Sequence, residues 1–223
     1  MYSVSQDLPR FSKTIFPSQL PSPSVKTNHV LLEYKCFIHH NACMIAVISD
    51  SHIPNRAESI PEEFHEKLGK ADITIHCGDF ESEKVYEELK EKYDIIGVKG
   101  NCDFFDISVS EKLTKNNVDF GVYHGAGINP RGHHPTLAKT ADTLNVEVLF
   151  HGHTHQQEIA EHKEKILLNP GSCTGVGGGS SSEKNPSMMT VNVSETGELE
   201  VKIFEIESSS GRISCRDNQV IGL

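Results

Sequence analysis

The chain has 223 residues, and its 31 acidic side chains outnumber its 21 basic ones, which gives a formal net charge of −10. This length favours one domain, or two at most, and suffices for a sizeable hydrophobic core. The acidic balance argues against non-specific nucleic-acid binding, which relies on Lys and Arg at phosphates. The sequence also has no apolar run of about 18 residues, which a membrane-spanning helix would need.

Histidine is abundant, with 13 residues, whereas Trp is absent. Because His is the commonest metal ligand in proteins, metal binding is the first hypothesis that this composition favours. The 6 Cys are too few for a disulfide scaffold and form no CxxC pair, which argues against a zinc ribbon. The cysteine content therefore favours a reducing, cytoplasmic compartment.

Residues 1–43 differ from the rest of the chain, because Pro and Ser recur among them and no helical or strand period holds. Such a stretch buries too little apolar surface to order itself, so we interpret it as a disordered leader or a mis-assigned start. Its basic balance leaves a transit peptide open as an alternative. We expect a domain over residues 44–207 and a polar C-terminal tail over residues 208–223.

From Met44 the chain begins with alternating strands and helices. The predicted elements are a strand at 45–49, a helix at 59–68, a strand at 73–75, a helix at 82–90 and a strand at 95–98. Ser59 is the expected N-cap of the first helix, because Glu62 follows three residues later, and Gly69 is its expected stop. A β-α-β-α-β series predicts a parallel sheet.

The second half of the chain is richer in strands. The predicted elements are a hairpin that turns at Asn116-Asn117, a helix at 135–144, a strand at 146–150, a hairpin that turns at Lys163-Glu164, and strands at 187–193 and 199–206. A parallel first half followed by a β-rich second half predicts two stacked sheets with helices outside them.

Residue types that bind metals recur where the predicted strands end. The five segments are Asp50-Ser51-His52, Gly78-Asp79, Gly100-Asn101-Cys102-Asp103, His124-Gly125 and His151-Gly152-His153-Thr154-His155. In open α/β sheets the carboxyl ends of the strands are where sites assemble. The segments therefore predict one cluster of Asp, Asn and His side chains at a sheet edge.

Each segment alone has an ordinary structural explanation. A Gly-Asn pair is more often a turn, an Asp-x-His triplet arises by chance, and His124 alone fits a core or surface histidine. The set of five favours a site, because every segment ends a strand and contains a Gly or Ser that lets the backbone approach closely.

These five motifs, in this order, resemble those of the calcineurin-like metallophosphoesterase superfamily. The similarity extends from Met44 to Ile206 and is greatest to the small archaeal and bacterial phosphodiesterases, which share the Asn169-Pro170-Gly171-Ser172 feature. Residues 52–56 and 59–61 also look like the small retromer coat subunit, which has the same fold. The resemblance implies an α/β architecture, a four-layer α/β/β/α sandwich of two mixed β-sheets.

The resemblance also implies a centre for two divalent transition metal ions, such as Mn²⁺ or Ni²⁺. One ion would bind Asp50, His52, Asp79 and His155, and the other would bind Asp79, Asn101, His124 and His153, so that Asp79 bridges them. Asn101, His124 and His153 are also the implied catalytic residues. The implied reaction is hydrolysis of a small phosphodiester through attack by hydroxide that the two metals activate.

One departure from the family pattern leaves the general acid unassigned. Cys102 stands where many members carry a His that helps to protonate the leaving oxygen, and a thiol is a mediocre acid for that purpose. A small buried hydrophobe is the better interpretation of Cys102. His133 and His134 are alternative acids, although surface histidines are the better interpretation of both.

Two functions from different classes stay open. The first is a phosphodiesterase whose substrate pocket is lined by the loops 126–135 and 172–186. The second is a non-enzymatic protein-interaction scaffold like the retromer subunit, but the seven intact ligand positions favour the enzyme. The Gly-rich stretch 175–182 lacks the ending of a P-loop, so we expect a flexible loop near the site. Homo-oligomer formation is also left open.

Overall fold

The computed structural model describes residues 42–179, 182–207 and 209–223. The expectations for residues 1–41, namely a disordered leader, a transit peptide or a mis-assigned start, lie outside the described residues. None of the described helices combines the length and the apolar character that a membrane span requires.

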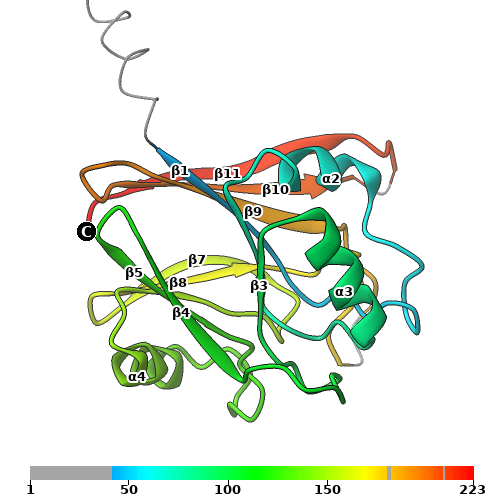
Figure 1. Ribbon diagram of the computed structural model, residues 1–223, viewed down its shortest axis with the longest axis horizontal. Helices are drawn as coiled ribbons and strands as arrows, with labels where there is room; N and C mark the ends of the chain where they lie inside the picture. Colours follow the sequence, from blue (N-terminus) through cyan, green and yellow to red (C-terminus); the bar gives the residue numbers. More distant parts are fainter. Residues whose placement is uncertain (1–41, 180–181, 208) are drawn as a thin grey trace, which may run out of the picture. The chain divides into compact units, whose positions relative to one another are not determined.

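One sheet has six strands and contains the parallel pairings that the first half of the sequence predicts (Figure 1). Its order is β11-β10-β9-β1-β2-β3. The strands are β1 (Cys43–Ile48), β2 (Ile73–His76), β3 (Ile95–Gly97), β9 (Ser187–Val193), β10 (Leu199–Ile206) and β11 (Ile213–Ile221). Because β1 pairs in parallel with β2, and β2 with β3, the carboxyl ends of these three strands lie at one edge of the sheet.

The second sheet has five strands in the order β4-β5-β6-β8-β7. They are β4 (Ser110–Lys115), β5 (Val118–Tyr123), β6 (Val148–Phe150), β7 (Gln157–His162) and β8 (Lys165–Pro170). β5, β6 and β8 run in parallel, and β4 and β7 flank them as antiparallel strands. Both predicted hairpins are confirmed, and their turn residues have the positive φ angles that tight two-residue turns require; these residues are Asn116, Asn117, Lys163 and Glu164.

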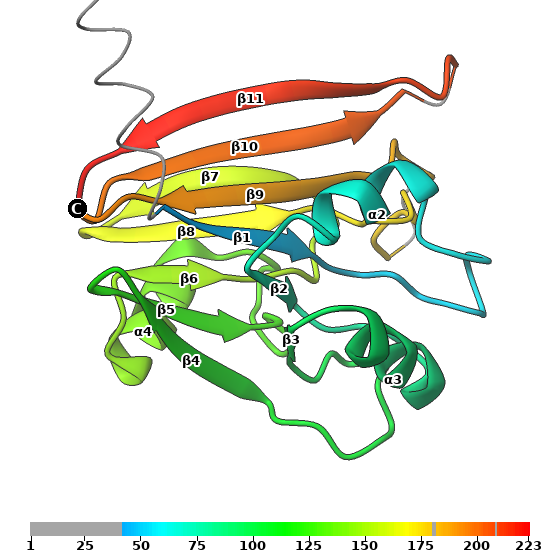
Figure 2. The same ribbon diagram turned by 45° about the horizontal axis from the view of Figure 1, so that its top comes forward.

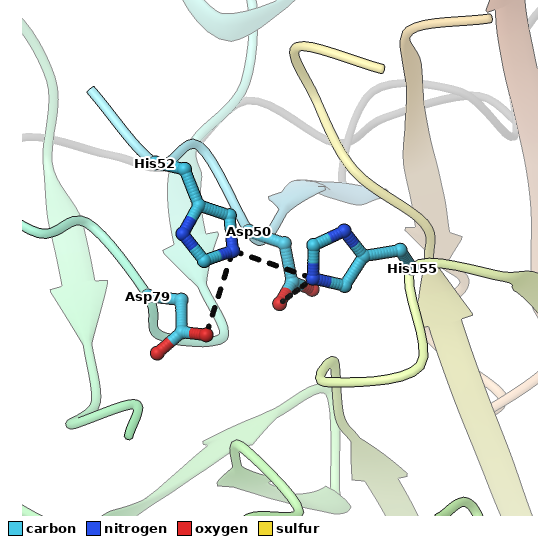
Figure 3. A group of neighbouring side chains, drawn as sticks. All are labelled: Asp50, His52, Asp79 and His155. Carbon is cyan, nitrogen blue, oxygen red and sulfur yellow. Dashed lines mark hydrogen bonds and ion pairs between the residues drawn. The ribbon is translucent and has the colours of Figure 1, made fainter. Parts of the chain in front are cut away.

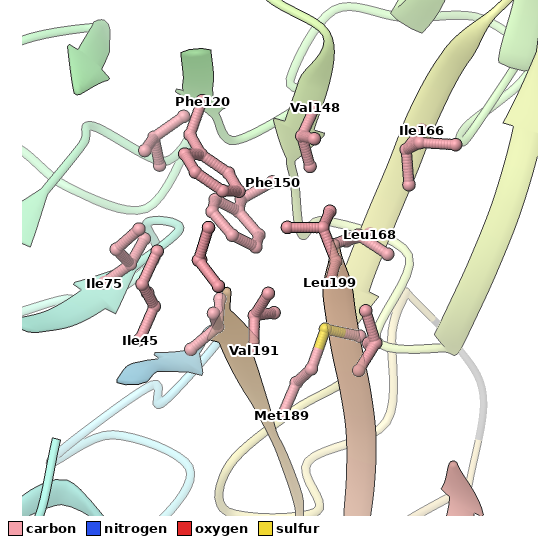
Figure 4. Packing of buried hydrophobic residues seen from close by; sticks show 14 of the residues in the cluster. Ile45, Ile75, Phe120, Val148, Phe150, Ile166, Leu168, Met189, Val191 and Leu199 are labelled. Carbon is pink, nitrogen blue, oxygen red and sulfur yellow. The ribbon is translucent and has the colours of Figure 1, made fainter. Parts of the chain in front are cut away.

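The two sheets pack face to face over a shared apolar core (Figure 4). Ile45 and Ile75 come from one sheet. Phe120 and Phe150 come from the other, and their rings stack with centroids 5.5 Å apart. The helices are α2 (Glu62–Leu68), α3 (Glu83–Lys92) and α4 (His134–Leu144). α2 and α3 cover the outer face of the six-stranded sheet, and α4 covers the five-stranded sheet (Figure 2). The predicted four-layer α/β/β/α sandwich is therefore confirmed.

The first helix begins later than the sequence predicts. α2 starts at Glu62 with Pro61 as its N-cap, so Ser59 does not cap it. Pro61 has extended backbone, with φ −55° and ψ 138°, and a proline also disfavours helical backbone at the residue before it. That residue, Ile60, is instead buried in the same apolar cluster as Phe64.

The C-terminal residues correct the prediction of a polar tail over residues 208–223. Ile213–Ile221 form β11, which pairs with β10 along the whole of that strand. The domain therefore extends beyond the predicted boundary at residue 207. The side chains of β11 are half-buried or exposed, because an edge strand is held largely by its backbone hydrogen bonds.

Removing β11 is expected to destabilise the domain. A chain that ends after Glu207 loses the pairing with β10 and the apolar contacts of Ile213 and Ile221, so we expect the free energy of unfolding to fall by about 2–3 kcal/mol. Urea unfolding measures this difference, and a chain that ends after Ile221 is the control because it keeps β11. Equal midpoints for the two chains would contradict the prediction.

Candidate metal centre

The predicted ligands lie at the edge where strands of both sheets end. Asp50 and His52 follow β1, Asp79 follows β2, Asn101 follows β3, His124 follows β5, and His153 and His155 follow β6. Six of the seven are buried, and Asn101 is exposed. The six-stranded sheet thus contributes the two carboxylates, one imidazole and the amide, whereas the five-stranded sheet contributes three imidazoles.

The first group of ligands consists of Asp50, His52, Asp79 and His155 (Figure 3). One donor atom of each lies within 4.8 Å of the others. His155 Nε2 lies 3.2 Å from Asp50 Oδ1 and 3.3 Å from His52 Nε2. His52 Nε2 in turn lies 3.5 Å from Asp79 Oδ2. Two carboxylates and two imidazoles therefore face one another, which is a donor set that suits a divalent transition metal ion.

The second group consists of Asp79, His124 and His153, and its donor atoms meet the same 4.8 Å limit. His124 Nε2 lies 3.4 Å from Asp79 Oδ2 and 3.2 Å from Asn101 Oδ1. The rings of His124 and His153 meet edge to face, with centroids 5.1 Å apart. Asp79 Oδ2 is therefore close to one imidazole of each group, which is the placement that a bridging carboxylate needs.

Hydrogen bonds on the outer side of two imidazoles orient the rings. His124 Nδ1 donates to the carbonyl oxygen of Cys77 at 2.7 Å, and His155 Nδ1 donates to that of Val176 at 2.6 Å. Because a carbonyl oxygen only accepts, each Nδ1 carries a proton, and in the neutral ring the Nε2 lone pair is left for a cation. The donor set therefore fits the metal ions that the sequence predicts.

Burial and mutual contacts shift the pKa values at the centre. Burial raises the pKa of Asp50, but the hydrogen bond with His155 and the charge of His124 outweigh burial and hold this pKa below its usual range. Burial lowers the pKa of His124, but Asp79 and Asp50 raise it to about 8. Burial and the neighbouring His124 lower the pKa of His153 to about 4. The buried carboxylates are thus ionised and attract positive charge, which metal cations would supply.

Five of the predicted ligands have left-handed backbone. The φ angles are 53° for Asp50, 49° for His52, 60° for Asp79, 67° for His153 and 54° for His155. This conformation is unfavourable for residues other than Gly, and it persists where the surrounding structure enforces it, as at functional sites. One enforcing contact joins the two sheets, since the backbone N–H of His153 donates to Asp50 Oδ2 at 3.1 Å.

Two further acidic residues, which were not among the predicted ligands, support the ligand loops. The carboxylate of Asp103 accepts hydrogen bonds from the backbone N–H groups of Asp79, Glu81 and Gly100, at 2.9, 2.8 and 2.7 Å. Glu81 Oε1 lies 2.9 Å from His52 Nδ1 and so orients that ring. For Asp103, its position in the segment after β3 was a sequence signal that could have predicted a role at the site. For Glu81, nothing in the sequence indicated such a role.

Asn169 supports the last ligand loop from the neighbouring strand β8. Its Nδ2 donates to the carbonyl oxygen of Gly152 at 3.1 Å and to Thr154 Oγ1 at 3.0 Å. Ser172 Oγ donates to the carbonyl oxygen of Asp50 at 2.8 Å. The sequence feature at residues 169–172 therefore has a structural role, because it fixes the backbone of two ligand loops.

The alternatives for the general acid have other partners. His133 Nδ1 lies 2.9 Å from Thr136 Oγ1, and His134 Nε2 lies 2.9 Å from Glu158 Oε1. Cys102 is half-buried rather than fully buried, and burial together with Asp79 raises the pKa of its thiol to about 12. The Cys102 thiol is therefore protonated at neutral pH, and the general acid stays unassigned.

A cavity of about 280 Å³ adjoins the centre. Arg131 from the loop 126–135 and Gly178 from the loop 172–186 both line it, together with Thr154. Thr154 lies between the last two predicted ligands in the sequence. Both loops that were predicted to line a pocket therefore border a cavity beside the candidate centre.

Comparison with known proteins identifies the family. The family model described as the calcineurin-like phosphoesterase superfamily domain matches residues 44–196. A curated "Probable metallophosphoesterase" from Methanocaldococcus jannaschii is 33% identical over 171 residues, which cover 77% of this chain and 85% of that protein. A protein of the same description from Methanothermobacter thermautotrophicus is 37% identical over 134 residues, which cover 59% and 77% of the two chains.

Solved structures of similar fold include Vps29 from Entamoeba histolytica. A single mutant of that protein has a TM-score of 0.72 and 27% identity, over 80% of this chain and 99% of that chain. The wild-type protein complexed with Zn²⁺ has a TM-score of 0.70 and 28% identity, over 79% and 98% of the two chains. The family model, the relatives and the two mixed sheets agree, and the chain belongs to the calcineurin-like phosphoesterase superfamily.

Proposed function

We propose that the protein is a phosphodiesterase that depends on two divalent metal ions and hydrolyses a small phosphodiester. The position of Asp79 carries this proposal, because its Oδ2 lies 3.5 Å from His52 Nε2 and 3.4 Å from His124 Nε2. One carboxylate can therefore serve both donor groups. A bridging carboxylate is what a two-metal site for phosphoryl transfer requires.

The side chains divide the work as follows. Asp50, His52, Asp79 and His155 would hold one ion, and Asp79, Asn101, His124 and His153 would hold the other. When bound, the two ions would polarise the phosphoryl oxygens and supply a nucleophile at neutral pH. His153 has a pKa of about 4 and is therefore neutral and able to act as a ligand at pH 7. Asn101 is exposed beside His124, where it can contact both an ion and the substrate.

The identity of the metal is part of the proposal. Mixed imidazole, carboxylate and amide ligation suits Mn²⁺, Ni²⁺ or Zn²⁺ better than Ca²⁺. The complex of Entamoeba Vps29 with Zn²⁺ supports metal binding by a protein of this fold. Mass spectrometric metal analysis of the purified protein, expected to give two ions per chain, tests this part directly.

Hydrolysis of bis-p-nitrophenyl phosphate tests the activity. We expect turnover that needs added Mn²⁺ or Ni²⁺ and that stops when EDTA removes the metal. The absence of turnover with every metal tried, in protein that binds two ions, would overturn the proposal.

That negative result would favour the second candidate, a protein-interaction scaffold. The likeness to Vps29 supports this alternative, and so does the side chain of Phe104, which is 91% exposed on the loop that follows Asn101. Aromatic side chains are enriched at protein–protein interfaces relative to the rest of the surface. The donor set favours the enzyme, because a scaffold does not need it.

Replacing Cys102 by alanine is expected to leave the hydrolysis of bis-p-nitrophenyl phosphate within about threefold of the wild type. The thiol, with a pKa of about 12, is a poor acid, and the backbone N–H of Cys102 donates to Asp79 Oδ1 at 2.7 Å. This hydrogen bond survives the substitution. Initial rates between pH 6 and 9 are the measurement, and a loss as large as that of an Asp79 variant would assign Cys102 a chemical role.

A further inference from the structure

The cavity of about 280 Å³ beside the centre is formed by two loops that meet at Thr154. Gly132 has a φ of +71°, and a Cβ there would lie 2.9 Å from Thr154 Cγ2. A Cβ on Gly178 would lie 2.9 Å from the carbonyl oxygen of Thr154. Glycines on both loops therefore allow close contact with the ligand loop, and this contact places the neighbouring Arg131 at the cavity beside the centre.

Arg131 is the positively charged residue of this cavity. Its side chain is exposed, and within the part of the chain that the structure describes it has no ion-pair partner. It lies beside the centre, because the next residue, Gly132, packs against Thr154, which lies in the sequence between the predicted ligands His153 and His155.

Two other charged groups near this cavity already have partners. Glu158, which also lines the cavity, lies 2.9 Å from His134 Nε2. Arg56, which lies on the other side of the loop 172–186, donates from Nη2 to the carbonyl oxygen of Gly177 at 2.7 Å and so has a structural role. Arg131 is therefore the guanidinium group that is left to bind a ligand.

We infer that Arg131 binds a second anionic group of the substrate, so that the preferred substrate is a phosphodiester that carries a further phosphate on the arm in the Thr154 cavity. The planar guanidinium donates two parallel hydrogen bonds to a phosphate, which gives both affinity and orientation. This inference rests on the proposed function, because it takes the first phosphate to bind at the metal centre.

Binding of two product-like nucleotides tests the inference without turnover. Thymidine 5′-monophosphate has one phosphate, and thymidine 3′,5′-bisphosphate adds a second. Titration calorimetry on Mn²⁺-loaded protein is expected to show that Arg131→Met weakens binding of the bisphosphate by about tenfold to a hundredfold, because charge-assisted hydrogen bonds are lost. Binding of the monophosphate should stay within about twofold. Arg131→Lys keeps the charge without the paired donors and should give an intermediate loss.

Lys139→Met is the matched control, because it removes the same charge from an exposed position of α4 that does not line the cavity. Equal weakening of both nucleotides by Arg131→Met, an equal effect of Lys139→Met, or no wild-type preference for the bisphosphate would each overturn the inference. A different outcome is that the wild type does not hydrolyse the diester but still prefers the bisphosphate in a way that depends on Arg131. This outcome would overturn the proposed function and leave the anion site supported.

Discussion

Replacing Asp79 by asparagine is expected to abolish metal-dependent hydrolysis of bis-p-nitrophenyl phosphate, with kcat/KM lowered by more than about a thousandfold. The amide removes the negative charge that the two donor groups share, since Asp79 Oδ2 lies within 3.5 Å of His52 and His124. The substitution keeps an oxygen that can accept from the Cys102 N–H, and asparagine tolerates the φ of 60°. The loss should therefore reflect chemistry rather than misfolding.

The control for this variant is Asp106→Asn, which removes a carboxylate from an exposed position of the loop after β3. Initial rates, metal content by mass spectrometry and the thermal unfolding midpoint are measured for both variants. We expect Asp79→Asn to retain less metal than the wild type with little change in its midpoint. Wild-type turnover by Asp79→Asn would contradict the shared role of this carboxylate.

Replacing Gly100 by alanine is expected to disrupt the metal centre, although Gly100 is not itself a predicted ligand. An added Cβ would overlap the backbone nitrogen and Oδ1 of Asp79 and would lie 2.8 Å from its Cα. The backbone cannot rotate away as a flexible side chain can, so the Asp79 loop must shift. Overpacking of this kind costs about 1–3 kcal/mol of the free energy of unfolding. A displacement of about 1 Å at a reacting centre lowers activity by about a hundredfold.

Gly222→Ala is the control for added volume, because a Cβ at this position meets nothing within 4 Å. Urea unfolding, metal content and hydrolysis rates are compared for the two alanine variants. We expect Gly100→Ala to lose stability and activity together, whereas Gly222→Ala keeps both. A fully active and stable Gly100→Ala protein would show that the Asp79 loop is more adaptable than its contacts indicate.

The central strands were predictable because burial determines their composition. β1 and β2 are buried, so their sequences are short apolar runs. β11 was not predicted because its side chains are mostly exposed. An edge strand of this kind pairs through its backbone and needs no apolar pattern. The start of α2 was misplaced because a favourable N-cap residue at Ser59 is overridden by Pro61 and by burial of Ile60.

The ligand positions were predictable because the chemistry restricts which residue types can occupy them. The supporting residues were harder to find, because their role depends on contacts between loops. Asp103 accepts from the N–H of Asp79, which is 24 residues away, and Glu81 contacts His52, which is 29 residues away. A carboxylate that accepts backbone hydrogen bonds has no fixed spacing in the sequence from the ligand that it supports. The loop that carries such a carboxylate therefore has no sequence pattern that sets it apart from other loops.

The division of the donors between the two sheets couples the centre to the stability of the whole sandwich. Asp50, His52, Asp79 and Asn101 extend from one sheet, and His124, His153 and His155 extend from the other. An ion held by both sets ties the sheets together at one end, much as a disulfide would. Each tenfold increase of free metal above the dissociation constants should then add about 1.4 kcal/mol per bound ion to the free energy of unfolding. The unfolding temperature should rise accordingly with metal concentration, because bound metal would hold the two sheets together at this end of the sandwich.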